Sequence, residues 1–190
     1  MKTGLFFGSF NPIHTGHLII AHHFSEFTDL NQIWFMVSPH NPLKKKSQLL
    51  DPSLRLELVK ASIADNPKFI CCSEEFHLPQ PSYTIQTLNH LTNKYPDHNF
   101  VLIAGSDTLQ TIKQWKQYKD ILRNYTIYVY PRHGHTTLPR LKAKKIRLFN
   151  FPLLHISATY IRKCIKRGKS VKYLVPDPAL HILQKRLFSQ

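Results

Sequence analysis

The feature that most constrains this chain is the alternation of short apolar runs with longer segments of helical periodicity. The first run covers residues 3–7, and later ones cover residues 32–37, 69–73, 100–104, 125–130 and 146–151. Runs this short, rich in β-branched and aromatic residues, indicate buried strands. Strands that alternate with helices favour a mostly parallel sheet with helices on both faces. We therefore predict an α/β fold built as a single domain over residues 1–190.

Several helix boundaries can be assigned from local signals. Asp51 followed by Pro52 is typical of a helix N-terminus, and Asn66-Pro67 closes that helix. Ser157 can cap another helix, which ends before Gly168. Further helices are expected over residues 17–27, over 83–94, over 107–122 with a break near Trp115, and after Pro176 through Leu187.

The charge balance points to anionic partners. The chain has 26 Lys and Arg against 11 Asp and Glu, a formal net charge of +15. Basic clusters lie at residues 140–147 and at Lys44, Lys45 and Lys46. Such a surplus attracts nucleotides, RNA or DNA, but charge alone does not choose among them, and a generally basic surface is the alternative.

Other classes of protein are disfavoured. No run of 18 apolar residues suggests a membrane span, and the first residues lack a signal-peptide cleavage site. The three cysteines, Cys71, Cys72 and Cys164, fit neither a disulfide framework nor a zinc spacing. We expect reduced thiols in a cytoplasmic protein without a membrane partner, with homo-oligomerisation left open.

The decapeptide GSFNPIHTGH, residues 8–17, reads as a strand-to-helix turn. Gly8 allows a ligand to approach the backbone, and the N–H groups that follow can face an anion. His17 falls in the first helical turn and His14 just before it, so both imidazoles can add positive potential to a phosphate site. Two alternatives remain: a metal pair, which lacks a nearby third ligand, and ordinary surface histidines.

A second helix start lies in HISATYIRKCIKRG, residues 155–168. Ser157 and Thr159 offer hydroxyl and N–H groups, and Arg162 lies one turn further, where a guanidinium can pair with phosphate oxygens. The alternative is a capped surface helix with ordinary basic residues.

A third segment, residues 104–115, ends an apolar run at Gly105. Asp107 stands where a carboxylate can accept ribose hydroxyls, although it equally suits a plain N-cap. Trp115 and Tyr118 can stack on a flat heterocycle or pack in the core. Gly8 and Gly105 both follow strands, at the edge where such sheets bind ligands.

These segments together indicate nucleotide chemistry. The P-loop signature and the G-x-G-x-x-G fingerprint are both missing from the sequence, and no Ser-His-Asp or Cys-His set stands out. A phosphoryl-type transfer that needs positioning and charge stabilisation fits best.

The motifs resemble those of a known family. GSFNPIHTGH is similar to the G-x-F-x-P-x-H-x-G-H signature of the nucleotidylyltransferase superfamily, and ISATYIR to its I-S-S-T-x-I-R motif. PSYTIQTL, AGSDTLQTIKQW, YPRHG and YLVPDPALHIL resemble segments of the bacterial nicotinate-nucleotide adenylyltransferases. The resemblance implies a Rossmann-like, doubly wound fold that transfers AMP from Mg²⁺-bound ATP to nicotinate mononucleotide in NAD biosynthesis.

The resemblance also implies roles for individual residues. The catalytic residues would be His14, His17 and Arg162, and no protein metal site is expected. Those that bind ATP would be Gly8, Ser9, Phe10, Lys44, Lys45, Lys46, Gly105, Asp107, Ser157 and Thr159. Those that bind nicotinate mononucleotide would be Thr84, Trp115 and Tyr118.

The sequence departs from the family pattern at Phe7, where a second glycine is frequent, and at Ala158, which replaces a serine. Rival functions are adenylyl transfer to nicotinamide mononucleotide or to phosphopantetheine. A nucleic-acid-binding module is a more distant rival, because the basic residues are not interleaved with aromatics.

Overall fold

The computed structural model describes residues 1–40, 49–132, 134, 145–150 and 155–188. Its strands are β1 (Lys2–Gly8), β2 (Gln32–Val37), β3 (Phe69–Cys72), β4 (Asn99–Gly105), β5 (Thr126–Tyr130) and β6 (Ile146–Leu148). Its helices are α1 (Thr15–Phe27), α2 (Pro52–Ile63), α3 (Thr84–Lys94), α4 (Ser106–Gln110), α5 (Tyr118–Asn124), α6 (Ala158–Lys166) and α7 (Asp177–Phe188). Two 3₁₀ helices, η2 (Glu74–His77) and η3 (Ile112–Gln114), complete the described elements.

The six strands form one sheet in the order β3-β2-β1-β4-β5-β6, and each described pair is parallel. In the register of the sheet, Phe6 of β1 lies opposite Phe35 of β2 on one side and opposite Ile103 of β4 on the other. From β1 the chain first adds β2 and β3 on one side, and then returns to add β4, β5 and β6 on the other. The place between β1 and β4 is therefore the switch point of a doubly wound sheet. The predicted α/β, Rossmann-like, doubly wound fold is confirmed.

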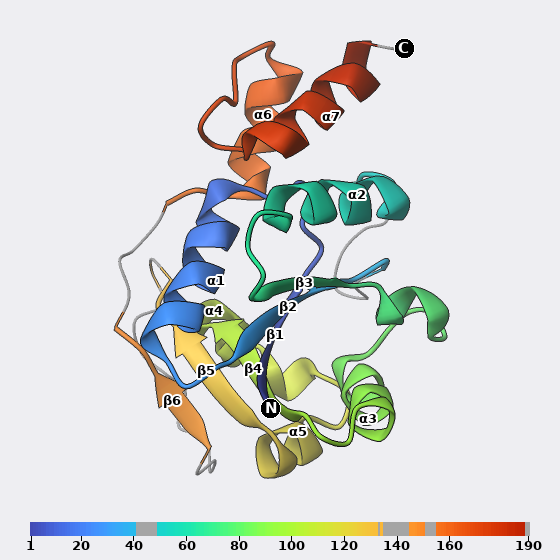
Figure 1. The fold of residues 1–190 in the computed structure, drawn as a ribbon, viewed down its shortest axis with the longest axis vertical. Coiled ribbons are helices and arrows are strands. Elements are labelled where there is room, and N and C mark those ends of the chain that lie inside the picture. The colour runs from blue at the N-terminus through green and yellow to red at the C-terminus, as the bar shows by residue number, and fades with distance from the viewer. Residues whose placement is uncertain (41–48, 133, 135–144, 151–154, 189–190) are drawn as a thin grey trace.

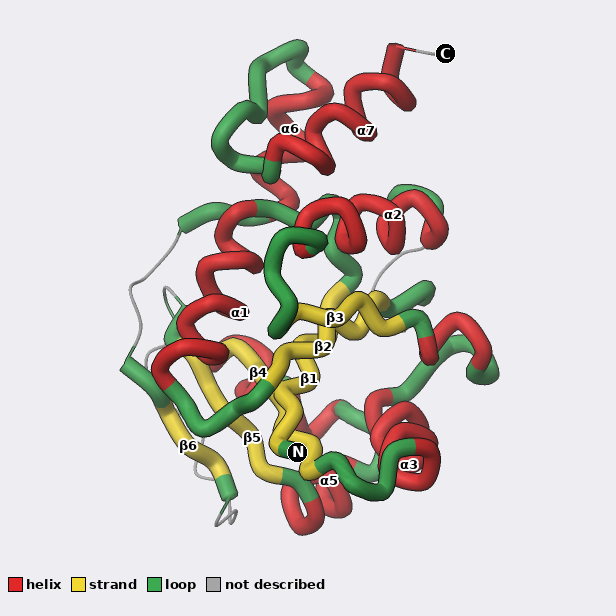
Figure 2. Tube along the Cα trace, in the orientation of Figure 1, coloured by secondary structure: helices red, strands yellow, loops and turns green. Residues whose placement is uncertain are grey.

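Alternate residues of the central strands β1, β2, β4 and β5 supply two cores, one on each face of the sheet. Phe6, Phe35 and Ile103 point to the face that α1 and α2 cover, and α6 and α7 lie beyond α2 at one end of the molecule (Figures 1 and 2). Their neighbours Leu5 and Leu102 point to the other face, which α3, α4, η3 and α5 cover. This period of two explains the continuous apolar runs, because a strand buried on both faces has no solvent side.

The helix signals locate most helix ends. Asp51 caps α2, where its carboxylate accepts from the N–H groups of Ser53 (2.9 Å) and Leu54 (3.1 Å). The expected break near Trp115 is confirmed, because α4, η3 and α5 replace one long helix. Gly168 follows α6 with a φ of +63°, the left-handed conformation that glycine adopts most readily.

Some details differ from the prediction. β6 ends at Leu148 rather than at residue 151, although Phe149 N still donates to Val129 O at 2.9 Å. η2 was missed, because four residues are too few to show a helical period. Among the described residues, no helix is long and apolar enough to span a membrane.

Candidate active site

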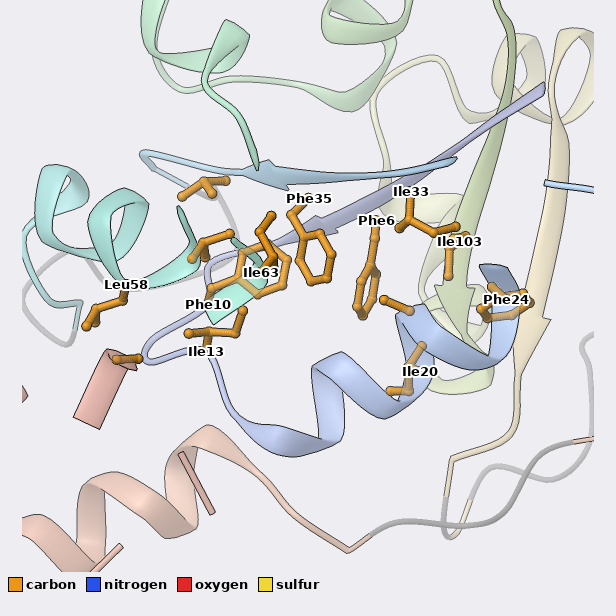
Figure 3. Packing of buried hydrophobic residues seen from close by; sticks show 14 of the residues in the cluster. Phe6, Phe10, Ile13, Ile20, Phe24, Ile33, Phe35, Leu58, Ile63 and Ile103 are labelled. Atoms are coloured by element: carbon orange, nitrogen blue, oxygen red, sulfur yellow. The ribbon is translucent and has the colours of Figure 1, made fainter. Parts of the chain in front are cut away.

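The turn after β1 is shaped around Gly8. Phe10 has a φ of +43°, and its ring folds back so that a Cβ on Gly8 would lie 2.8 Å from it. The Phe10 ring is buried against Phe6 and Phe35, with centroids 5.8 Å and 5.6 Å away (Figure 3). The phenylalanine thus anchors the turn in the core, and glycine is required beneath it.

His14 and His17 converge as the sequence predicts. His14 is the N-cap residue of α1, and His17 occupies the third position of its first turn. Their rings stack with centroids 3.7 Å apart, and His14 N donates to His17 Nδ1 at 3.2 Å. The two imidazoles therefore form one unit at the positive end of the α1 dipole, beside the C-terminal edge of β1.

The structure corrects one expectation about charge. His14 is only 3 % exposed, and this burial, reinforced by the nearby Arg132 guanidinium, lowers its pKa to about 4. His14 is therefore neutral near pH 7 and adds no positive charge there. Its Nδ1 is buried without a hydrogen-bond partner among the described residues. A neutral ring with one N–H suits hydrogen bonding to a ligand oxygen more than ion pairing.

The second helix start lies against the first turn. Ser157 caps α6, where its Oγ accepts from Tyr160 N at 3.2 Å. The Arg162 guanidinium donates to Asn11 O at 2.8 Å and to Thr159 Oγ1 at 3.2 Å. Residues more than 150 positions apart in sequence are thereby joined at one edge of the sheet. The structure brings together the two motifs that the sequence singled out.

The end of β4 contributes Gly105 and Asp107. Gly105, not Asp107, is the N-cap residue of α4, so the N-cap alternative for Asp107 is wrong. A Cβ on Gly105 would collide with the Asp107 side chain and would lie 3.1 Å from Arg132 Cγ. Asp107 Oδ1 accepts from Thr108 N at 2.9 Å, and its side chain is 42 % exposed. Part of this carboxylate therefore still faces solvent at the sheet edge.

Arg132 is a site residue that sequence reasoning missed. It follows β5, its guanidinium lies over the Tyr130 ring at 5.4 Å, and its Nε is 3.9 Å from Asp107 Oδ2. That Nε is buried without a hydrogen-bond partner among the described residues. The signal that could have found it is its place after a strand, on the same edge as Gly8 and Gly105.

A third group lies on the other face of the sheet. Thr84 begins α3 and is half-buried, while Trp115 and Tyr118 flank the start of α5 and pack partly against the second core. Lys116 Nζ lies 4.5 Å from the centre of the Tyr83 ring, which places the start of α3 beside the tryptophan segment. The three residues predicted for the second substrate thus belong to neighbouring segments.

The structure does not test every predicted site residue. Lys44, Lys45 and Lys46 lie outside the described residues. Within the described part of the chain, no three or more His, Cys, Asp or Glu side chains gather where they could hold a metal ion.

The pKa values of Cys71 and Cys72 are raised by burial to about 11 and about 12, so both thiols stay protonated near neutral pH.

The geometry defines a class of protein. A parallel sheet presents two helix N-termini, a stacked histidine pair and two arginines at its switch point. Helix N-termini and arginines at this edge bind the phosphates of nucleotides. The chain is an α/β protein built to bind a nucleotide.

Comparisons with known proteins narrow the class. Residues 5–164 match the cytidylyltransferase-like family. A probable nicotinate-nucleotide adenylyltransferase of Cytophaga hutchinsonii is 49% identical over 99% of this chain and 98% of its own length. One of Flavobacterium johnsoniae is 52% identical over 93% of this chain and 92% of its own length. This chain belongs to the cytidylyltransferase-like family, among its nicotinate-nucleotide adenylyltransferases.

A solved structure supports the fold. The Plasmodium falciparum nicotinic acid mononucleotide adenylyltransferase complexed with NaAD superposes with a TM-score of 0.83, at 20% identity, over 97% of this chain and 95% of that one. At this identity the likeness concerns the arrangement of strands and helices alone.

Proposed function

We propose that this chain transfers AMP from ATP to nicotinate mononucleotide, releasing pyrophosphate and forming nicotinate adenine dinucleotide. The observation that carries the proposal is the hydrogen bond from Arg162 to Asn11 O, which joins the two phosphate-type helix starts in one site. The names of full-length relatives at 49% and 52% identity supply the acceptor nucleotide.

The first two motifs would hold ATP. His14 and His17 would hydrogen-bond its phosphates, and His17 would stabilise charge at the α-phosphate. Ser157, Thr159 and Arg162 would hold the β- and γ-phosphates. Further ATP contacts are proposed for Gly8, Ser9, Phe10, Gly105 and Asp107, and for one of Lys44, Lys45 and Lys46.

The nicotinate mononucleotide would bind near the start of α3. Thr84, Trp115 and Tyr118 would shape its pocket, because one offers a hydroxyl and two offer flat rings next to a helix N-terminus. Both rings are half-buried against the second core, and the exposed part of each would stack on the nicotinate ring.

The chemistry needs no general base. The phosphate of nicotinate mononucleotide is already ionised, so one of its oxygens attacks the α-phosphorus. The bond from that phosphorus to the bridging oxygen of the β-phosphate breaks, and pyrophosphate leaves with the electron pair. The protein holds the reactants in line and stabilises charge on the phosphoryl oxygens. Neutral His14 fits a hydrogen-bonding role in this step.

Magnesium would enter with ATP rather than reside in the protein. Mg²⁺ keeps several waters and commonly binds through substrate phosphates, so the donors found here suit a metal that the triphosphate carries. When bound, it would reduce the negative charge that the α-phosphorus presents to the attacking oxygen. His17 and Arg162 would act on the same phosphates from the protein side.

The direct test is the product. The purified chain is incubated with ATP, MgCl₂ and nicotinate mononucleotide, and the dinucleotide is identified by mass spectrometry, with EDTA in a parallel sample. We expect nicotinate adenine dinucleotide and an equal amount of pyrophosphate, with both abolished by EDTA. ATP hydrolysis without any dinucleotide would contradict the proposal.

A further inference from the structure

A fully buried arginine lies behind the phosphate-binding turn. Arg55, in α2, has an exposed fraction of 0 %. Its Nη1 donates to Ser9 O and Ser38 O, both at 2.7 Å, and its Nη2 to Pro39 O at 2.7 Å. Its Nε donates to Leu50 O at 3.0 Å. One side chain thus connects the turn after β1, the end of β2 and the segment before α2.

These four acceptors are backbone carbonyls, and none of the ion pairs among the described residues involves Arg55. A buried charge without a carboxylate partner is expensive unless its donors are satisfied. A planar fork can meet several carbonyls at fixed angles, whereas a lysine ammonium cannot. The geometry therefore fixes the position of Ser9 relative to β2.

A buried carboxylate occupies the equivalent place behind the start of α3. Glu75, in η2, is 2 % exposed. Its Oε2 accepts from Ser82 Oγ and its Oε1 from Thr87 Oγ1, both at 2.9 Å. Burial raises its pKa, and hydrogen bonds from Ser38, Thr87 and Ser82 oppose that rise. Glu75 thus holds the segment on either side of Thr84.

Ser38 connects the two buried groups. It follows β2, and its N donates to Gly8 O at 3.0 Å. Its carbonyl accepts from Arg55, while its side chain lies near enough to Glu75 to oppose the rise of the Glu75 pKa. Arg55 and Glu75 are therefore coupled through one residue, although each serves a different segment of the site.

We infer that Arg55 and Glu75 are positioning residues for the two substrate half-sites. Arg55 fixes the turn that receives the ATP phosphates, and Glu75 fixes the start of α3 that shapes the nicotinate pocket. The inference rests on the proposed function and adds residues that touch neither substrate. A positioning role differs from a purely structural one because each residue should affect one substrate more than the other.

The test is a crossed comparison of KM values in the full chain. Arg55→Lys keeps the charge and loses the fork, while Glu75→Gln keeps the shape and loses one acceptor. Leu58→Val in α2 and Leu88→Val in α3 are the controls, because both leucines are 0 % exposed and touch neither loop through hydrogen bonds. KM for ATP, KM for nicotinate mononucleotide, kcat and thermal unfolding are measured for all five proteins.

We expect Arg55→Lys to raise the KM for ATP about tenfold and to leave the other KM within about twofold, since hydrogen bonds to a charged group are lost. Glu75→Gln should show the converse. If Arg55→Lys does not fold, Arg55→Gln replaces it in the ATP comparison. If Glu75→Gln does not fold, Ser82→Ala, which removes one donor to Glu75, replaces it in the nicotinate mononucleotide comparison. Equal shifts in both KM values, matching the loss of thermal stability seen in the controls, would overturn the inference. Inactive wild-type protein would instead overturn the proposed function, and the inference with it.

Discussion

At the scale of single residues, the two stacked histidines have different roles although they share one motif. His17 occupies the first turn of α1, where the positive end of the helix dipole helps it to stabilise negative charge. We predict that His17→Ala lowers kcat at least about a hundredfold, because losing one such donor costs about 2.7–4 kcal/mol of barrier. His22→Ala, on the exposed part of the same helix, is the matched control in the same pyrophosphate assay. A folded His17→Ala protein with wild-type kcat would contradict the role.

The buried state of His14 predicts a dependence of stability on pH. Its pKa is about 4 in the folded protein against 6.5 for the ordinary group, so the unfolded chain takes up the proton first as pH falls. The stabilisation is present above about pH 6.5 and is lost towards pH 4, by about 3 kcal/mol. Urea unfolding at both pH values should show this extra loss in wild type and not in His14→Gln. Equal losses in the two proteins would show that His14 is not buried as described.

How far single residues can be predicted depends on where their partners lie in sequence. His14, His17 and Arg162 are visible because short motifs place them at helix starts. Arg55 and Glu75 are not, because their partners lie up to 46 positions away and a charged residue inside a helical pattern resembles a solvated one. The neutral state of His14 could not be predicted from the sequence either, because it depends on burial and on the nearby Arg132.

At the scale of elements, α2 matters because it carries Arg55 into the site. Its N-cap, Asp51, satisfies two backbone donors at the helix start. We predict that Asp51→Ala lowers the free energy of unfolding by about 1 kcal/mol, the usual cost of a lost N-cap. Asp65→Ala, exposed beyond the end of α2, should change it by less than about 0.5 kcal/mol. Chemical denaturation of both variants checks this, and equal stability would show that the cap contributes nothing.

The elements themselves were largely predictable. Strands buried on both faces leave short apolar runs, and Asp51, Ser157 and Gly168 mark helix ends through chemistry that is local in sequence. β6 and η2 were harder, because a three-residue edge strand and a four-residue 3₁₀ helix depend on their neighbours. The pairing of α6 with the first turn is likewise a tertiary contact that no local pattern contains.

At the scale of the whole molecule, the positive charge is unevenly distributed along the chain. Residues 121–176 contain thirteen Lys and Arg and no Asp or Glu, and they include Arg132 and Arg162 of the site. A field of this kind speeds the arrival of anionic substrates and is screened by salt.

We therefore predict that kcat/KM for ATP falls at least about threefold between about 50 and about 500 mM NaCl, while kcat changes less. Lys169 is exposed within that basic segment, and Lys60 is exposed on α2. Lys169→Glu should reduce the salt dependence of kcat/KM for ATP more than Lys60→Glu does. Stopped-flow binding of ATP at both salt concentrations gives the association rate directly. A rate that does not respond to salt would contradict electrostatic steering.

The central claim concerns which nucleotide accepts AMP. It is tested most directly by kcat/KM for pyrophosphate release with ATP and each of three acceptors: nicotinate mononucleotide, nicotinamide mononucleotide and phosphopantetheine. The account predicts a clear preference for nicotinate mononucleotide, because Thr84, Trp115 and Tyr118 are proposed to form its pocket. A preference for phosphopantetheine would leave the ATP site standing and contradict the role given to those three residues.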